Sequence, residues 1–185
     1  AVDLILRSQA QNALHGWRYQ AFGKDADTTV SGAQMVALYA ASNAGVHVPD
    51  EAISNGLSYF KASMDSKGGI GYTQKGSANS TRTAIASLAY SLNKDRDSEE
   101  SKLTFSWIRN SQDERSSYMF YHMYYMAQAL FHGDMNVWRA WNQNVLAVGV
   151  AALDAARPVG GRPDPAVAHH EGVVVLAAGE GDRAE

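Results

Sequence analysis

Two stretches of the chain repeat the same order of residues: GWRYQAFGKDADTTVSGAQMVALYAASN at 16–43 and GIGYTQKGSANSTRTAIASLAYSLN at 69–93. Each begins with a Gly-x-x-Tyr group, continues through a polar loop and ends in a run of small residues that carries almost no charge. A third run, SYMFYHMYYMAQALFH at 117–132, has the same Ala-Leu ending but is far more aromatic. Self-similarity at a period of about 40–50 residues indicates an array of helical pairs.

More amphipathic segments alternate with these runs. Pro49 suits the first turn of a helix, and Asp50 with Glu51 suits the positive end of its dipole. Similar segments begin near residues 98 and 134. Asp134 is the predicted N-cap of the second of these segments. We expect Gly45 and Gly133 to end the helices that come before them.

The sequence therefore predicts an all-α fold of about three helical hairpins in residues 1–144. A helix with little polar surface is buried on most sides, so the three low-charge runs should form an inner layer. The amphipathic segments should lie outside, in a solenoid or a partial α/α toroid of inner and outer helices. A strand is suggested only at 173–176, in an otherwise irregular C-terminal tail.

Composition excludes several classes of protein. The chain has 185 residues, 45% of them hydrophobic, and a net charge of −3, so a broad basic surface for nucleic acid is not expected. It contains no Cys, which excludes disulfides, iron–sulfur clusters and Cys-ligated zinc. No apolar run approaches the roughly 20 residues of a membrane-spanning helix.

The last 41 residues, 145–185, differ from the rest of the chain. They use only nine residue types and hold three Arg against six acids, whereas residues 1–144 hold 13 basic and 13 acidic side chains. We interpret 145–185 as a low-complexity tail that is non-native or out of frame, and residues 1–144 as a fragment of a longer protein. An incomplete ring would expose apolar inner faces, so we expect self-association.

The repeat resembles the prenyltransferase and squalene-cyclase superfamily of α/α toroids, in particular bacterial repeat proteins without an assigned activity. Three groups of residues carry the resemblance: Gly16-Trp17-Arg18-Tyr19, the stretch Asp27-Thr28-Thr29-Val30-Ser31-Gly32-Ala33-Gln34, and the second copy from Gly68-Gly69-Ile70-Gly71-Tyr72 to Thr81-Arg82-Thr83-Ala84. It covers residues 1–144 and leaves the tail without a counterpart.

This resemblance implies a terpenoid-cyclase-like domain that binds an apolar, isoprenoid-like ligand without a cofactor. The zinc and magnesium motifs of related enzymes are missing, so no metal site is expected. A protein-binding helical scaffold is the alternative, and a polysaccharide-acting α/α enzyme is a weaker one because paired carboxylates are lacking. The location stays open between a bacterial cytoplasm and export.

Two residues are candidates for catalysis. Asp25-Ala26-Asp27-Thr28-Thr29 resembles the acid motif of class II terpene cyclases, although Thr28 stands where the last Asp belongs. Asp27 also precedes a helix, as Asn79 does in the second copy, which favours a capping role. His122, on the aromatic run, is either a base in a central cavity or a buried side chain bonded to a neighbouring helix.

Aromatic residues are the candidates for binding. In a cyclase-like cavity, ring faces stabilise carbocations, and they can equally stack on sugar rings. The competing interpretation is that these rings pack the core between helices. The candidate binding residues are Trp17, Tyr19, Tyr72, Tyr118, Tyr121 and Tyr125.

Overall fold

The computed structural model describes residues 1–93, 97–112, 116 and 118–156. Regular structure in this part of the chain is helical, apart from a single antiparallel bridge between Met64 and Ile70. The all-α prediction is thus confirmed for the described residues, whereas 173–176 lies outside them. The helices are α1 (Val2–Ala10), α2 (Thr28–Asn43), α3 (Asp50–Ala62), α4 (Ser80–Leu92), α5 (Glu99–Arg109), α6 (Met119–Gly133) and α7 (Met135–Ala156).

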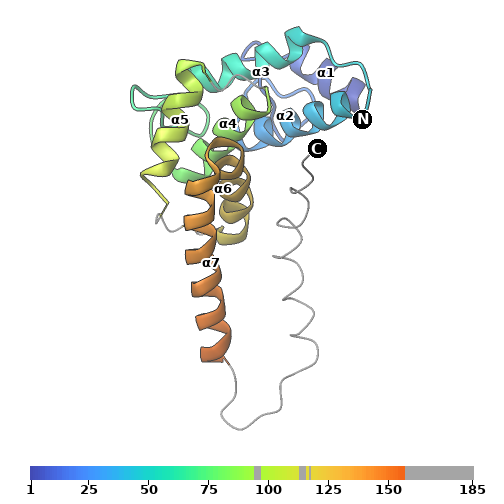
Figure 1. The fold of residues 1–185 in the computed structure, drawn as a ribbon. Helices are drawn as coiled ribbons and strands as arrows, with labels where there is room; N and C mark the ends of the chain where they lie inside the picture. The colour runs from blue at the N-terminus through green and yellow to red at the C-terminus, as the bar shows by residue number, and fades with distance from the viewer. Residues whose placement is uncertain (94–96, 113–115, 117, 157–185) are drawn as a thin grey trace, which may run out of the picture. The chain divides into compact units, whose positions relative to one another are not determined.

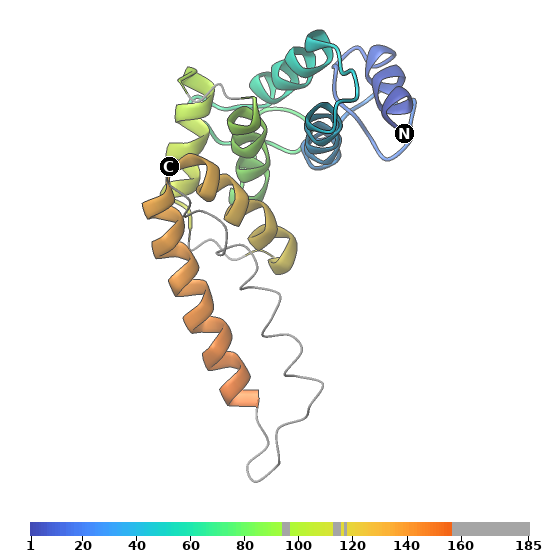
Figure 2. The same cartoon turned by 45° about the vertical axis from the view of Figure 1, so that its right-hand side comes forward.

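The first six helices form two layers (Figures 1 and 2). Helices α1, α3 and α5 follow one another along one side, and α2, α4 and α6 along the other. The first layer is linked by the Gln9 side chain, which donates to the Ala52 carbonyl at 2.9 Å, and by the Lys61–Glu100 ion pair at 2.5 Å. In the second layer α4 packs between α2 and α6.

Helix α4 is the centre of the core. Every residue from Ser80 to Ser91 except Arg82 is buried, and α4 contacts α2, α3, α5 and α6. Its small residues allow this, because helices approach closely only where side chains are short. The same holds for Gly32 on α2, where an added Cβ would lie 2.0 Å from Cγ2 of Ile85.

The helix ends agree with the capping signals. Asp27 accepts from the backbone N–H groups of Thr29 and Val30, and Asp134 caps α7 in the same way. Gly45 follows α2 with φ +83°, the conformation expected after a helix. Gly133 is the last residue of α6, and an added Cβ there would lie 2.1 Å from Cε2 of Phe105, so the packing of α5 leaves room only for a glycine.

The repeat is visible in atomic detail between Gly16 and Gly69. An added Cβ on either glycine would lie 2.7 Å from a Cβ of the same loop, that of Ala26 or Ala78. In both copies the next backbone N–H donates to a hydroxyl one turn into the following helix: Trp17 to Ser31 at 2.9 Å, and Ile70 to Thr83 at 3.1 Å.

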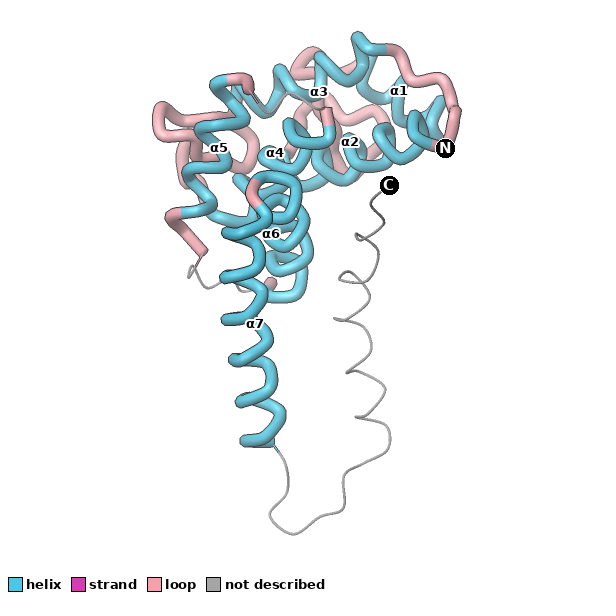
Figure 3. The backbone as a smooth tube through the Cα atoms, in the orientation of Figure 1, coloured by secondary structure: helices cyan, strands magenta, loops and turns pink. Residues whose placement is uncertain are grey.

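The turns before these glycines also match. The side chains of Asn12 and Asp65 each accept from the backbone N–H two residues later at 2.8 Å. His15 and Gly68, three residues further on, both have positive φ, +59° and +92°. The period read from Gly16 to Gly69 is 53 residues, longer than the 40–50 expected, because long loops precede α2 and α4 (Figure 3).

The chain divides into two compact units, Ala1–Asn142 and Gln143–Glu185, close to the change of composition after residue 144. Among the described residues, no helix is both long enough and apolar enough to cross a bilayer.

Candidate functional site

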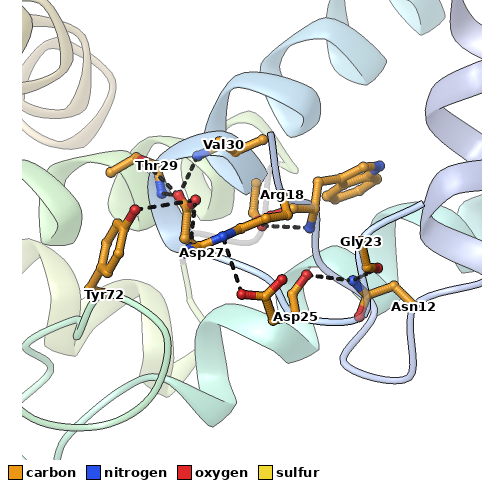
Figure 4. Close-up of polar contacts among 10 residues, drawn as sticks. Asn12, Arg18, Gly23, Asp25, Asp27, Thr29, Val30 and Tyr72 are labelled. Carbon is orange, nitrogen blue, oxygen red and sulfur yellow. Dashed lines mark hydrogen bonds and ion pairs between the residues drawn. The ribbon is translucent and has the colours of Figure 1, made fainter. Parts of the chain in front are cut away.

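The centre of the candidate site is the Asp27 carboxylate at the start of α2 (Figure 4). This side chain is fully buried. Its Oδ1 accepts from the backbone N–H groups of Thr29 and Val30, at 2.9 and 2.8 Å, and from the Thr29 hydroxyl at 2.5 Å. Its Oδ2 lies 3.1 Å from Arg18 Nη1 and 3.5 Å from the Tyr72 hydroxyl. Both oxygens are therefore surrounded by donors.

Arg18 joins this carboxylate to a second one. Its Nε lies 3.2 Å from Asp25 Oδ2, while Nη1 pairs with Asp27. The loop is held by Asn12, whose side-chain N–H groups donate to the carbonyls of Gly23 and Asp25 at 3.1 and 2.9 Å. The guanidinium thus has a fixed position between two carboxylates.

Tyrosine rings flank this guanidinium. Its carbon lies 5.9 Å from the ring centre of Tyr19 and 5.5 Å from that of Tyr72. The Arg82 guanidinium lies 5.9 Å from the Tyr72 ring, and its Nε donates to the Ile70 carbonyl at 3.4 Å. Cation–π contacts at this range are worth about 0.5–1 kcal/mol at an exposed site. They orient the Tyr72 ring between two arginines.

Tyr121, on α6, completes the group. Its pKa is raised, chiefly by burial, then by Tyr125, and further by the charges of Asp27 and Tyr19. The pKa of Tyr72 is also raised, by burial first and then by Asp27 and Tyr19. The loops before α2 and α4 therefore meet around Arg18, and Tyr121 of α6 lies within the influence of the Asp27 charge. We call the set Arg18, Tyr19, Tyr72, Arg82 and Tyr121 the tyrosine–arginine cluster.

The cluster's tyrosines keep much of their surface exposed. Tyr19 is 77% exposed, Tyr121 39% and Tyr72 38%. Tyr118 is 78% exposed at the start of α6. Tyr19 and Tyr72 lie beside the Arg18 guanidinium and Tyr121 packs against Tyr125, so part of each of these three rings remains accessible.

Three other candidates are buried. Trp17 donates its indole N–H to the Ile5 carbonyl at 2.9 Å, which gives it a packing role. Tyr125 lies beneath Tyr121 and Tyr124, with ring centres 4.9 and 5.0 Å away. His122 Nδ1 lies 2.9 Å from the Thr81 hydroxyl and joins α6 to the start of α4. That is the hydrogen-bonded alternative foreseen for this histidine.

Asp27 is an acceptor in every contact around it. A carboxyl that gives a proton to a substrate needs a bound proton and a path to the cavity. Here the two oxygens meet N–H groups, a hydroxyl and a guanidinium. Asn79 also caps α4 by accepting from the Arg82 N–H at 2.9 Å. A capping role thus accounts for the position of Asp27.

A concave region away from the tyrosine–arginine cluster carries no signal in the sequence. It is a hollow of about 680 Å³ lined by the last turns of α2 and α4 and by α3. Tyr39, Tyr90 and Leu57 contribute to its wall, and the Lys61–Glu100 pair lines it as well. These residues carry no motif, because the hollow arises only when residues of α2, α3, α4 and α5 come together.

Among the described residues, no group of three or more His, Asp or Glu side chains is placed to hold a metal ion. Comparison of the chain with protein-family models, with curated proteins and with solved structures found no match.

Proposed function

We propose that this chain is a segment of an α/α repeat array that binds an apolar, isoprenoid-like ligand over the tyrosine–arginine cluster. The observation that carries the proposal is that Tyr19 and Tyr72, from two loops, both lie within 6 Å of the Arg18 guanidinium and stay partly exposed. Tyr121 of α6 adds a third partly exposed ring, whose raised pKa includes a contribution from the Asp27 charge. Aromatic surfaces of this kind bind flat or extended apolar molecules. A toroidal arrangement of the helical pairs is part of the same proposal.

The charge of the site favours a neutral ligand. Arg18 and Arg82 bring two positive charges, and Asp25 with Asp27 brings two negative ones. Both carboxylates are engaged by the same guanidinium, Arg18. A free phosphate or diphosphate group would have to compete with them. An isoprenoid alcohol or hydrocarbon can bind without displacing a carboxylate from Arg18.

The arginines act as positioning residues in this proposal. Arg18 lies between Tyr19 and Tyr72, and it is itself fixed by Asp25 and Asp27. Rigid rings lose little conformational entropy on binding, which is why fixed aromatic contacts favour affinity. The activity proposed is binding, since Asp27 and His122 both have structural partners.

The experiment is a titration of the full chain with farnesol, followed by calorimetry or by tyrosine fluorescence. Farnesyl diphosphate and maltoheptaose serve as charged and sugar probes. We expect farnesol to bind more tightly than either. Tighter binding of maltoheptaose would favour a glycan-binding site instead, and the absence of binding to all three would contradict a small-molecule site.

Tyr19→Ala tests the site with little risk to the fold, because this side chain is largely exposed. The loss of one aromatic contact of about 1.5 kcal/mol weakens binding roughly tenfold. Phe131→Ala is the matched control: it removes an exposed ring from the opposite end of α6 and should leave affinity unchanged. Equal losses in the two variants would contradict the assignment.

A further inference from the structure

The hollow of about 680 Å³ follows α3 along almost its whole length. The residues that α3 contributes to it form two parallel rows at helical spacing. Ile53 and Leu57 are half-buried, whereas Asp50, Ser54 and Ser58 are exposed. A channel in which an apolar row runs beside a polar one suits a ligand with an aliphatic body and polar groups placed along it.

Hydroxyl groups along the hollow already donate their protons within the protein. Ser54 and Ser58 each donate to the backbone carbonyl three residues earlier, at 3.0 and 2.7 Å. Tyr90, which is only 4% exposed, donates to the Leu57 carbonyl at 3.2 Å. The lone pairs of these oxygens can still accept. They therefore favour a ligand that brings hydrogen-bond donors.

The hollow has a carboxylate toward each end. Asp50 begins α3, and Lys61 lies near the end of this helix, about 16 Å away along the axis. Lys61 pairs with Glu100 of α5 at 2.5 Å, and this hydrogen bond lowers the pKa of Glu100. The Lys61 side chain is 67% exposed, so an incoming cation can replace it at Glu100 at little cost.

The ends of α2 and α4 add to this negative character. Asn43 is the last residue of α2, Asn93 is the C-cap of α4, and both line the hollow. The C-terminal end of a helix carries a partial negative charge. Neither helix has a basic residue in its last turn, whereas α1, α3 and α5 have Arg7, Lys61 and Arg109 there. Both ends therefore favour a cation in the hollow.

We infer that the hollow binds a linear aliphatic polyamine, with its methylene groups along Ile53 and Leu57 and an ammonium group near Asp50 at one end and near Glu100 at the other. Ammonium groups are donors only, which matches the accepting oxygens between the two ends. An anion would instead meet both carboxylates. The hollow is separate from the tyrosine–arginine cluster, so this inference does not depend on the function proposed above.

The first test is calorimetry of the full chain at low salt with three amines. Spermine is a long tetraamine, and α,ω-diaminododecane combines the length of spermine with the charge of putrescine. We expect both long amines to bind more tightly than putrescine, which is too short to reach both carboxylates. Equal affinities of the two diamines, or no binding of spermine, would overturn the inference.

Variants of the carboxylates test the two ends. Asp50→Asn and Glu100→Gln keep the size of the side chain, and each should weaken spermine binding about threefold. Glu51→Gln is the matched control, because it removes the same charge from the same turn of α3 but from a residue outside the hollow. Circular dichroism checks that each variant folds. Equal losses in all three variants would reduce the effect to net charge and overturn the inference.

Lys61→Ala tests the direction of the charge effect, because it removes the side chain that competes for Glu100. Spermine should bind this variant about threefold more tightly than the wild type. Lys67→Ala removes the same charge from an exposed loop residue and should leave the affinity unchanged. Weaker binding by Lys61→Ala would make Lys61 a ligand contact and overturn the inference.

Tyrosine NMR signals locate the bound amine. Tyr39 and Tyr90 line the hollow, so their signals should shift as spermine is added. Those of Tyr19 and Tyr72, in the tyrosine–arginine cluster, should stay in place. The reverse pattern would put the amine outside the hollow and overturn the inference.

Discussion

The loop before α2 and the loop before α4 are two versions of one structure. Both contain a tightly packed glycine, a conserved geometry of the preceding turn and a capping side chain at the helix start. They differ in charge. The first loop has Arg18, Asp25 and Asp27, whereas the second has the uncharged residues Gly71, Ser77 and Asn79 at the corresponding positions. What the copies share is architecture. What only the first copy has is the ionic group that holds the tyrosines.

The largest expected effect concerns the tightly packed glycine that the two loops share. Gly16→Ala and Gly69→Ala each place a Cβ within 3.0 Å of three neighbouring atoms, including Tyr59 in the first copy and Trp107 in the second. Overpacking of this kind costs about 3 kcal/mol in free energy of unfolding. Urea denaturation measures it.

Gly23→Ala is the control for that pair, since its closest neighbour, Arg18 Cβ, is 3.0 Å away and the next is at 3.4 Å. Gly23→Ala should lower the free energy of unfolding much less than either Gly16→Ala or Gly69→Ala. If one of Gly16 and Gly69 tolerated alanine while the other did not, the two loops would not be equivalent in packing.

The second prediction sharpens the difference in charge. Asn79→Ala removes a cap and should cost about 1 kcal/mol. Asp27→Ala removes a cap together with the Arg18 ion pair and the Thr29 hydroxyl contact, and should cost about 2 kcal/mol. Thermal or urea unfolding compares them.

Asp27→Asn gives the internal control for that comparison. Asparagine accepts from the same backbone groups, so this variant should lose less stability than Asp27→Ala. Equal stability of Asn79→Ala and Asp27→Ala would show that the ion pair adds nothing to the first copy.

The smallest effect appears only at high pH. Burial raises the pKa of Tyr59 from 10.0 to about 12, whereas the matching aromatic residue in the second copy is Trp107, which does not ionise. A raised pKa means that the folded state holds the proton more tightly than the unfolded state. The stability it contributes is complete below pH 10 and is lost as pH rises toward 12.

At pH 11 that loss is about 1 kcal/mol. Urea denaturation at pH 8 and pH 11 measures it, with Tyr59→Phe as the variant that lacks the titrating group. The variant should show a shallower alkaline loss than the wild type. Identical slopes would assign the alkaline loss to other groups.

Much of this fold follows from local signals in the sequence. Small-residue runs with almost no charge predicted α2 and α4, and Asp27, Asn79 and Asp134 predicted where helices begin, because caps depend on a few adjacent residues. Gly45 and Gly133 both mark the ends of helices as expected, but only Gly45 has a positive φ. A glycine after a helix and a glycine beneath a packed ring look alike until the partner, Phe105, is placed.

The site could be predicted only in part. Tyr19, Tyr72 and Tyr121 were recognised as aromatic candidates, yet nothing in their spacing separates them from the buried Trp17 and Tyr125. Whether one of these aromatic side chains is exposed or buried depends on which other parts of the chain pack against it in the folded structure. The second arginine, Arg82, gave no signal, because its contact with Tyr72 joins the start of α4 to the preceding loop.

The central claim is that a ligand lies over the tyrosine–arginine cluster. Selective labelling of the nine tyrosines, with assignment by single Tyr→Phe variants, allows a farnesol titration to be followed by NMR. The account predicts shifts at Tyr19, Tyr72 and Tyr121, with Tyr39 and Tyr90 in the hollow at the other ends of α2 and α4 unchanged. Shifts confined to Tyr39 and Tyr90, or none at saturating farnesol, would contradict it.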